Sequence, residues 1–114
     1  MIINHFLKSD ITFSQDLSEA ALSFTTTIGR NFKVEQIIFH ASQNITETIT
    51  ITLDSAQGAN YDTRLRRKTL NAEQDYVWIP EGEVNFKSGD EIKIQCTNAN
   101  KTGTIRGIVK PSAM

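Results

Sequence analysis

The strongest constraint on the fold of this chain is an apolar pattern that repeats every second residue. Residues 45–55 read ITETITITLDS and show it most clearly. Successive side chains of a β-strand point to opposite faces, so Ile49, Ile51 and Leu53 are expected in the core. The other face then carries a row of hydroxyl side chains, Thr46, Thr48, Thr50 and Thr52. This row is either an ordinary solvated strand face or a surface that contacts a neighbouring subunit, and the sequence leaves both open.

Alternation or short apolar runs recur along the chain, separated by turns rich in Gly, Asn, Asp and Ser. The other expected strands lie within residues 22–28, 32–41, 61–70, 76–79, 83–98 and 104–110. A competing helix signal, SQDLSEAAL at residues 14–22, has too short an apolar stripe to be convincing. About eight short strands, with no helices to cover a parallel sheet, predict an all-β fold: an antiparallel sandwich or barrel.

The length of 114 residues fits a single domain, residues 1–114. The 12 basic and 13 acidic residues give a formal charge of −1, which predicts no strong attraction of the whole molecule to nucleic acid or to an anionic membrane. The opening MIINHFLKSD lacks the features of a secretory signal, and no apolar run reaches the ~20 residues that span a bilayer. We therefore expect a soluble protein that is made in the cytoplasm.

No residue pattern indicates catalysis, a metal or a cofactor. His40 is interpreted as a packed, hydrogen-bonded side chain rather than as a base or ligand. Cys96, the only cysteine, is expected in the core and excludes both an intrachain disulfide and a cysteine zinc site. Asp54 and Asp62 flank the Gly58 loop without the spacing of an EF-hand, so calcium binding has little support. We expect a protein without enzymatic activity.

The basic run RLRRK offers a candidate contact surface. In an extended strand Arg64, Arg66 and Lys68 share one face, opposite Leu65 and Arg67. That face either contacts an acidic protein surface or is the solvated face of an edge strand that its charge protects from aggregation. Protein contact is favoured over nucleic acid, because nucleic-acid platforms interleave exposed aromatic residues with the basic ones.

Residues 32–41 form the strand with apolar side chains on both faces. Strict alternation places Phe32, Val34 and Ile38 on one face, and Ile37, Phe39 and Ala41 on the other. Such a strand is either central in a sheet or covered at an interface. Ile37 and Phe39 are therefore candidates for the centre of an oligomer interface.

Four segments in order carry a resemblance to a known family: FKVEQIIFHAS, ETITITLDSAQGANYDTRLRRKTL, DYVWIP and VNFKSGDEIKIQCTNANKTGTIRGIV. Over residues 32–109 the sequence resembles small virion proteins of tailed phages. The resemblance implies a jelly-roll-like sandwich without enzymatic activity. It also implies a decoration or cement protein on the head exterior, made in the host cytoplasm and binding the major capsid protein. Members of such families often form trimers that bridge capsid subunits.

Residues 1–23 lie outside the match, and the sequence leaves them as an N-terminal arm or as extra strands. Within the resemblance, the strand at residues 32–41 would supply the centre of an oligomer interface. The basic face and the threonine row would supply contacts with the capsid.

The alternative function is a tail-fibre or spike domain, or a carbohydrate-binding sandwich. Sugar-binding sandwiches use exposed aromatic side chains as stacking platforms, and Tyr61, Tyr76 and Trp78 are the candidates here. Trp78 is equally interpreted as a core anchor between Val77 and Ile79. Exposure of all three aromatic residues on one surface would favour the glycan platform, whereas burial of Trp78 would remove its best residue.

Overall fold

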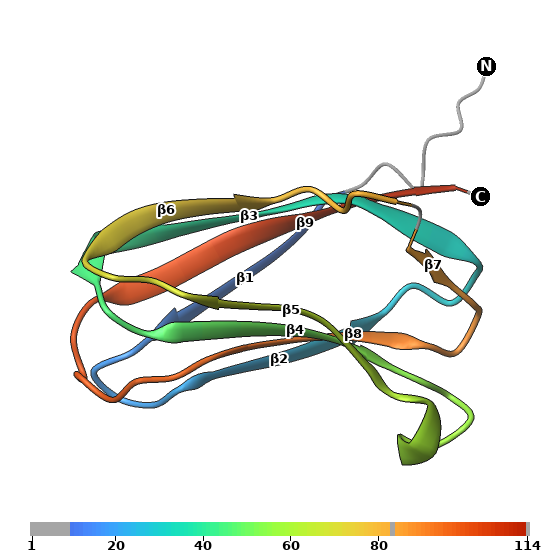
Figure 1. Cartoon of the computed structure of the whole chain (residues 1–114), viewed down its shortest axis with the longest axis horizontal. Helices are drawn as coiled ribbons and strands as arrows, with labels where there is room; N and C mark the ends of the chain where they lie inside the picture. The colour runs from blue at the N-terminus through green and yellow to red at the C-terminus, as the bar shows by residue number, and fades with distance from the viewer. Residues whose placement is uncertain (1–9, 83, 114) are drawn as a thin grey trace.

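The computed structural model describes residues 10–82 and 84–113. In these residues the chain forms nine strands and one short 3-10 helix, which confirms the all-β prediction (Figure 1). The elements are β1 (Ile11–Asp16), β2 (Leu22–Thr27), β3 (Phe32–Ile45), β4 (Thr48–Asp54), η2 (Ala59–Tyr61), β5 (Thr63–Thr69), β6 (Glu73–Trp78), β7 (Asn85–Phe86), β8 (Glu91–Cys96) and β9 (Thr104–Ala113). No helix in this part of the chain is long and apolar enough to span a membrane.

The strands form two antiparallel sheets that pack face to face (Figure 1). One sheet has the order β1-β9-β3-β6, with β7 also paired to β3, and the other has the order β2-β8-β4-β5. The strands form four nested pairs, which we call mirror pairs: β1 with β9, β2 with β8, β3 with β6 and β4 with β5. This is the pattern of a long antiparallel hairpin rolled into two sheets, a jelly roll.

The sequence left two alternatives for residues 1–23, an N-terminal arm or extra strands. Residues 1–9 lie outside the described residues. Ile11–Asp16 form β1, which pairs with β9 along its whole length. The helix signal at residues 14–22 corresponds to the end of β1 followed by a turn. The Asp16 carboxylate caps this turn, because it accepts hydrogen bonds from the backbone N–H and the hydroxyl of Ser18 at 2.9 and 2.7 Å.

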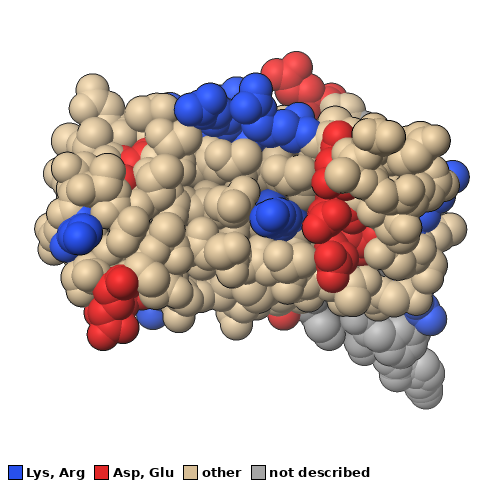
Figure 2. All heavy atoms as spheres, turned by 90° about the horizontal axis from the view of Figure 1, so that it is seen from below, with Lys and Arg blue, Asp and Glu red and all other residues tan. Residues whose placement is uncertain are grey.

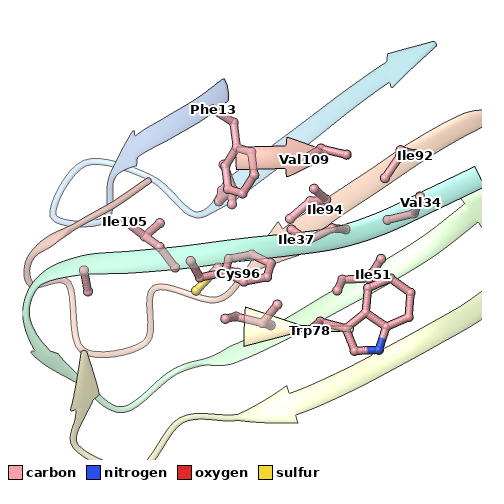
Figure 3. Close-up of a cluster of buried hydrophobic side chains, with 14 of the residues drawn as sticks. Phe13, Val34, Ile37, Ile51, Trp78, Ile92, Ile94, Cys96, Ile105 and Val109 are labelled. Atoms are coloured by element: carbon pink, nitrogen blue, oxygen red, sulfur yellow. The ribbon is translucent and has the colours of Figure 1, made fainter. Parts of the chain in front are cut away.

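Apolar side chains from both sheets fill the space between them (Figure 3). Ile49 and Ile51 of β4 are fully buried, as their alternation predicts, while Leu53 is partly buried at the edge of the core. Cys96 and Trp78 are also buried, which confirms the interpretation of both as core residues.

Close packing between β1 and β9 depends on the absence of a side chain at Gly107. Phe13 is the cross-strand partner of Gly107, and a Cβ there would lie 2.5 Å from Phe13 Cζ and against the carbonyl oxygen of Ile38. The freed space lets the Phe13 ring stack on Phe24 and meet Phe39 edge-on, with ring centroids 5.3 and 5.6 Å apart. Edge strand β1 thereby contributes an aromatic anchor to the core.

A β-bulge in β3 changes which side chains of residues 32–41 point to the core, so the predicted assignment to the two faces is wrong. Val34 pairs with Pro111 and Gln36 with Lys110, so Glu35 has no partner in the ladder. Pro111 has no N–H to donate, and this favours an irregularity opposite it. The extra residue shifts the phase, so Val34 and Ile37 both point inward.

The proposal of Ile37 and Phe39 as an oligomer interface is therefore wrong. Their side chains are 0% and 1% exposed between the two sheets, where no second chain can reach them. The apolar residue of β3 that points outward is Ile38, which is half-buried. The apolar outer face that we expected for this strand therefore consists of Ile38 and not of Ile37 and Phe39.

Candidate protein-contact surfaces

The outer face of the β2-β8-β4-β5 sheet carries the threonine row. Thr48, Thr50 and Thr52 alternate with buried Ile49 and Ile51 and are half-buried on this outer face. Thr46 does not belong to the row, because it precedes β4 and its hydroxyl accepts the backbone N–H of Ala72 at 3.0 Å. Three of the four predicted threonines therefore form a surface. We call the whole outer face of this sheet the threonine face.

Hydroxyl side chains occupy the edge strand β2 of the threonine face as well as β4. Ser23, Thr25 and Thr27 are exposed on β2, and β8 lies between the two strands. Lys93 of β8 pairs with both Thr25 and Thr52, so it stands in the middle of the face. Figure 2 shows basic residues gathered along one long edge of this face, a basic group near its middle and a band of acidic residues across it.

A second bulge lies within the basic run of β5, so its basic side chains do not point to the faces that alternation predicts. Arg66 pairs with Ile51 and Arg64 with Thr52, so Leu65 is the extra residue of β5. Arg64 and Arg67 therefore lie on the threonine face, next to Thr52 and Thr50. Arg66 and Lys68 pair with Ile51 and Ile49, whose side chains point to the core. The predicted common face of Arg64, Arg66 and Lys68 is wrong.

Arg66 and Lys68 instead close the open edge between β5 and β6. Arg66 Nε donates a 2.8 Å hydrogen bond to the hydroxyl of Tyr76. Lys68 Nζ lies 5.7 Å from the centre of the same ring and 4.0 Å from a carboxylate oxygen of Glu73. These contacts connect the two sheets, so Arg64 and Arg67 are the cations of β5 that remain for an external partner.

The glycan platform predicted from Tyr61, Tyr76 and Trp78 is also wrong. Trp78 is 9% exposed in the core, and Tyr76 is half-buried under Lys68 with its ring centroid 5.9 Å from that of Phe39. Tyr61 is 60% exposed, but it lies in η2 on the loop that projects beyond β4 and β5 (Figure 1). The three aromatic residues do not share a surface.

The outer face of the β1-β9-β3-β6 sheet carries an apolar row that the sequence did not reveal. Ile38 pairs with Ile108 on one side and with Val77 on the other, and Ile108 pairs with Thr12 of β1. Val77 is 47% exposed, and Ile79, just past the end of β6, is 64% exposed. We call Thr12, Ile108, Ile38 and Val77 the apolar row.

A charged row lies beside the apolar row, one step along the strands. Its members are cross-strand neighbours in the order Ser14, Arg106, His40 and Asp75. His40 Nδ1 and Asp75 Oδ1 are 2.6 Å apart. This bond confirms that His40 is hydrogen-bonded, but its side chain is 44% exposed on the outer face and is not the packed side chain that the sequence predicted. The Arg106 side chain makes no hydrogen bond or ion pair with any described residue.

Residues of both rows line a shallow hollow of about 620 Å³ between β1 and β3. A smaller hollow of about 160 Å³ lies on the other side of Arg106, next to Ser42 and Thr104. The Ser42 hydroxyl accepts the Thr104 backbone N–H at 2.9 Å, and His40 has no hydroxyl partner among the described residues. The histidine–aspartate pair is therefore not aligned with a nucleophile in this part of the chain.

Carboxylates hold the loops around Gly58 in place. Asp90 accepts the backbone N–H groups of Ala56 and Lys87 at 3.0 and 2.9 Å, and Asp62 accepts that of Ser55 at 2.8 Å. These acidic residues around the Gly58 loop therefore act as acceptors for backbone donors. No group of three or more metal-ligating side chains is found among the described residues.

Glu47 is the most enclosed carboxylate among the described residues, with 3% of its surface exposed. It accepts hydrogen bonds from the Thr97 hydroxyl and from the backbone N–H groups of Ala99 and Asn100, at 2.7, 2.9 and 2.8 Å. Burial raises the pKa of Glu47, but these hydrogen bonds outweigh burial, and the net result is a lowered pKa. Burial, together with the charge of Glu47, raises the pKa of the Cys96 thiol to about 12.

Comparison with a solved structure supports the fold. The family 32 carbohydrate-binding module of NanJ from C. perfringens, solved in complex with galactose, matches 91% of this chain and 78% of that chain with a TM-score of 0.57 and 15% identity. The core of Drosophila NLP matches 92% of this chain and 99% of its own length, with a TM-score of 0.48 and 13% identity. The infectious bursal disease virus structure, Gx strain, matches 93% and 29% with a TM-score of 0.36 and 16% identity.

No protein-family model matches the sequence, and no curated protein is significantly similar to it. The likeness to the carbohydrate-binding module, at 15% identity, shows the jelly-roll sandwich and no more than the fold.

Proposed function

We propose that this protein is a non-enzymatic structural protein of a tailed-phage virion, a decoration protein that binds the major capsid protein on the head exterior. The apolar row is the observation that carries the proposal. It places three adjacent aliphatic side chains on an outer sheet face, with Ile79 exposed beside them. Exposed apolar clusters of this kind, rimmed by polar residues, mark protein–protein contact sites. The ordered resemblance to phage virion proteins supports the same assignment.

The two outer faces have different chemistry, and we assign them different partners. The apolar row joins copies of the chain into a homo-oligomer. The threonine face, with Arg64 and Arg67 at its edge, contacts an acidic part of the capsid surface. Charges at the rim of an interface fix orientation and speed association more than they add affinity.

Binding to empty shells assembled from the major capsid protein tests the proposal. We expect the purified protein to co-sediment with the shells and to appear as additional density on their exterior by electron microscopy. A protein that remains in the supernatant, and virions whose images do not change when its gene is deleted, would refute it.

A matched pair of variants separates the threonine face from general charge effects. Arg64→Glu/Arg67→Glu should weaken shell binding by more than tenfold, because both side chains lie on the assigned face. Arg30→Glu reverses an exposed charge in the turn between β2 and β3 and should bind as the unchanged protein does. Equal loss in both variants would remove the threonine face as the capsid contact.

A further inference from the structure

We infer that a second copy of this chain packs face to face on the outer side of the β1-β9-β3-β6 sheet. The two copies are related by a two-fold axis that lies between the two facing sheets and runs parallel to β3. This inference rests on one part of the proposed function, the assignment of the apolar row to contacts between copies of the chain. It concerns one contact between two copies and does not require the capsid.

The order of the strands makes this face complementary to itself about that axis. β9 and β6 flank β3 on its two sides, each one strand spacing away. Rotation by 180° about an axis that is parallel to β3 and lies above this outer face therefore places β9 of one copy opposite β6 of the other, and positions along the strands are retained. Residues that occupy the same cross-strand row then face one another.

The charged row pairs opposite charges under this rotation. Arg106 and Asp75 are both direct partners of His40, one on each side. Arg106 consequently faces the partner's Asp75, and the reciprocal pair forms by symmetry. Within one copy the backbones of the two residues stand two strand spacings apart, about 10 Å, and no ion pair joins their side chains.

Both groups have unused bonding capacity in the single chain. Arg106 has no hydrogen-bond or ion-pair partner among the described residues, and the hollows on both sides of it leave room for an incoming side chain. Asp75 uses Oδ1 for His40, so Oδ2 can accept a guanidinium. Lys110, another cation of β9, is already paired with Asp10 at 3.1 Å and does not compete.

The apolar row matches itself in the same way. Ile108 faces the partner's Val77, and Ile38 meets its own copy on the axis. The contact covers Val77, which is 47% exposed in the single chain. An apolar centre beside reciprocal charge pairs is the usual anatomy of a two-fold protein interface.

Charge reversal with rescue tests this pairing. In sedimentation equilibrium across a concentration series, the unchanged chain should be a dimer. Arg106→Glu alone and Asp75→Arg alone should each raise the dimer dissociation constant more than tenfold, because each places like charges opposite one another. The double variant Arg106→Glu/Asp75→Arg should recover most of the affinity. Arg64→Glu, on the other sheet, should leave the dimer unchanged.

Circular dichroism of each variant establishes that the fold is retained. A monomer at every concentration, a trimer such as the phage resemblance implies, or a double variant no tighter than the singles would overturn the two-fold pairing. Shell binding is measured separately on the same variants. In the unchanged chain, absence of a dimer with shell binding present refutes the pairing alone, and absence of shell binding with a dimer present refutes the capsid assignment alone.

Discussion

The Thr97 hydroxyl donates a 2.7 Å hydrogen bond to the buried carboxylate of Glu47, and this contact joins the start of β4 to the turn between β8 and β9. The same carboxylate accepts two backbone N–H groups of that turn. The Thr97 hydroxyl in turn accepts the backbone N–H of Thr48 at 2.9 Å. A single acidic side chain therefore organises the donors of one end of the sandwich.

Removal of the Glu47 carboxylate should destabilise the fold strongly. Glu47→Ala leaves one hydroxyl and two backbone donors without an acceptor, and we expect a loss of about 3 kcal/mol in the free energy of unfolding. Urea denaturation with an unchanged m-value would measure it. Glu19→Ala, at an exposed position in the turn after β1, serves as the control and should change stability by less than about 0.5 kcal/mol.

Glu47 should also make stability depend on pH in the acid range. Its pKa in the folded chain lies below the ordinary value of 4.5, so the unfolded chain binds the proton more tightly. The stabilisation is therefore fully present above that ordinary value and is lost as the pH falls through the lower folded pKa. Urea midpoints measured from neutral to acid pH should fall less steeply for Glu47→Gln than for the unchanged chain. Parallel curves would contradict this role.

A methyl group at position 107 should disrupt the packing of β1 on β9. The new Cβ of Gly107→Ala would meet the Phe13 ring and the backbone oxygen of Ile38, and the backbone cannot move aside cheaply. We expect a loss of about 3 kcal/mol, at the upper end for overpacking of a core. Gly82→Ala has no atom within 4 Å of the new Cβ and provides the control. Equal thermal midpoints for the two variants would show that β1 is not packed as described.

The Cys96 thiol should be inert in the folded protein. Its pKa is raised from 9.0 to about 12, so the reactive thiolate is roughly a thousandfold less populated than in an exposed cysteine. A thiol reagent at mildly alkaline pH should label the native chain only as fast as it opens and label the urea-unfolded chain at once. Rapid labelling without denaturant would contradict the burial of this side chain.

Alternation along the chain predicted the class of fold because most strands have one face toward the core. Ile49 and Ile51 were assigned to the interior correctly, and Thr48, Thr50 and Thr52 to the outside. The core position of Cys96 also followed from its place in β8. These successes share a cause, since each concerns a strand segment without an inserted residue.

The predictions for the Ile37 and Phe39 interface and for the basic face failed because their strands contain a bulge. The extra residues Glu35 and Leu65 reverse the phase within β3 and β5, so side chains two positions apart no longer share a face. Pro111 was a usable signal for the first bulge, because a proline inside a strand implies an interrupted ladder. No comparable signal accompanies Leu65. The apolar row was invisible for a different reason, since it depends on pairing among four strands that are distant in sequence.

The mirror pairing of the strands also governs when the sandwich can be completed during synthesis. Ile11 pairs with Val109, and β1 has no strand neighbour other than β9 within the described chain. Among the four mirror pairs, β4 and β5 are the closest in sequence, whereas β1 and β9 join the two ends of the chain. Such non-local pairing predicts slow folding. The first sheet must therefore wait, with the edge of β3 that β9 will occupy uncovered, until the ribosome has released β9.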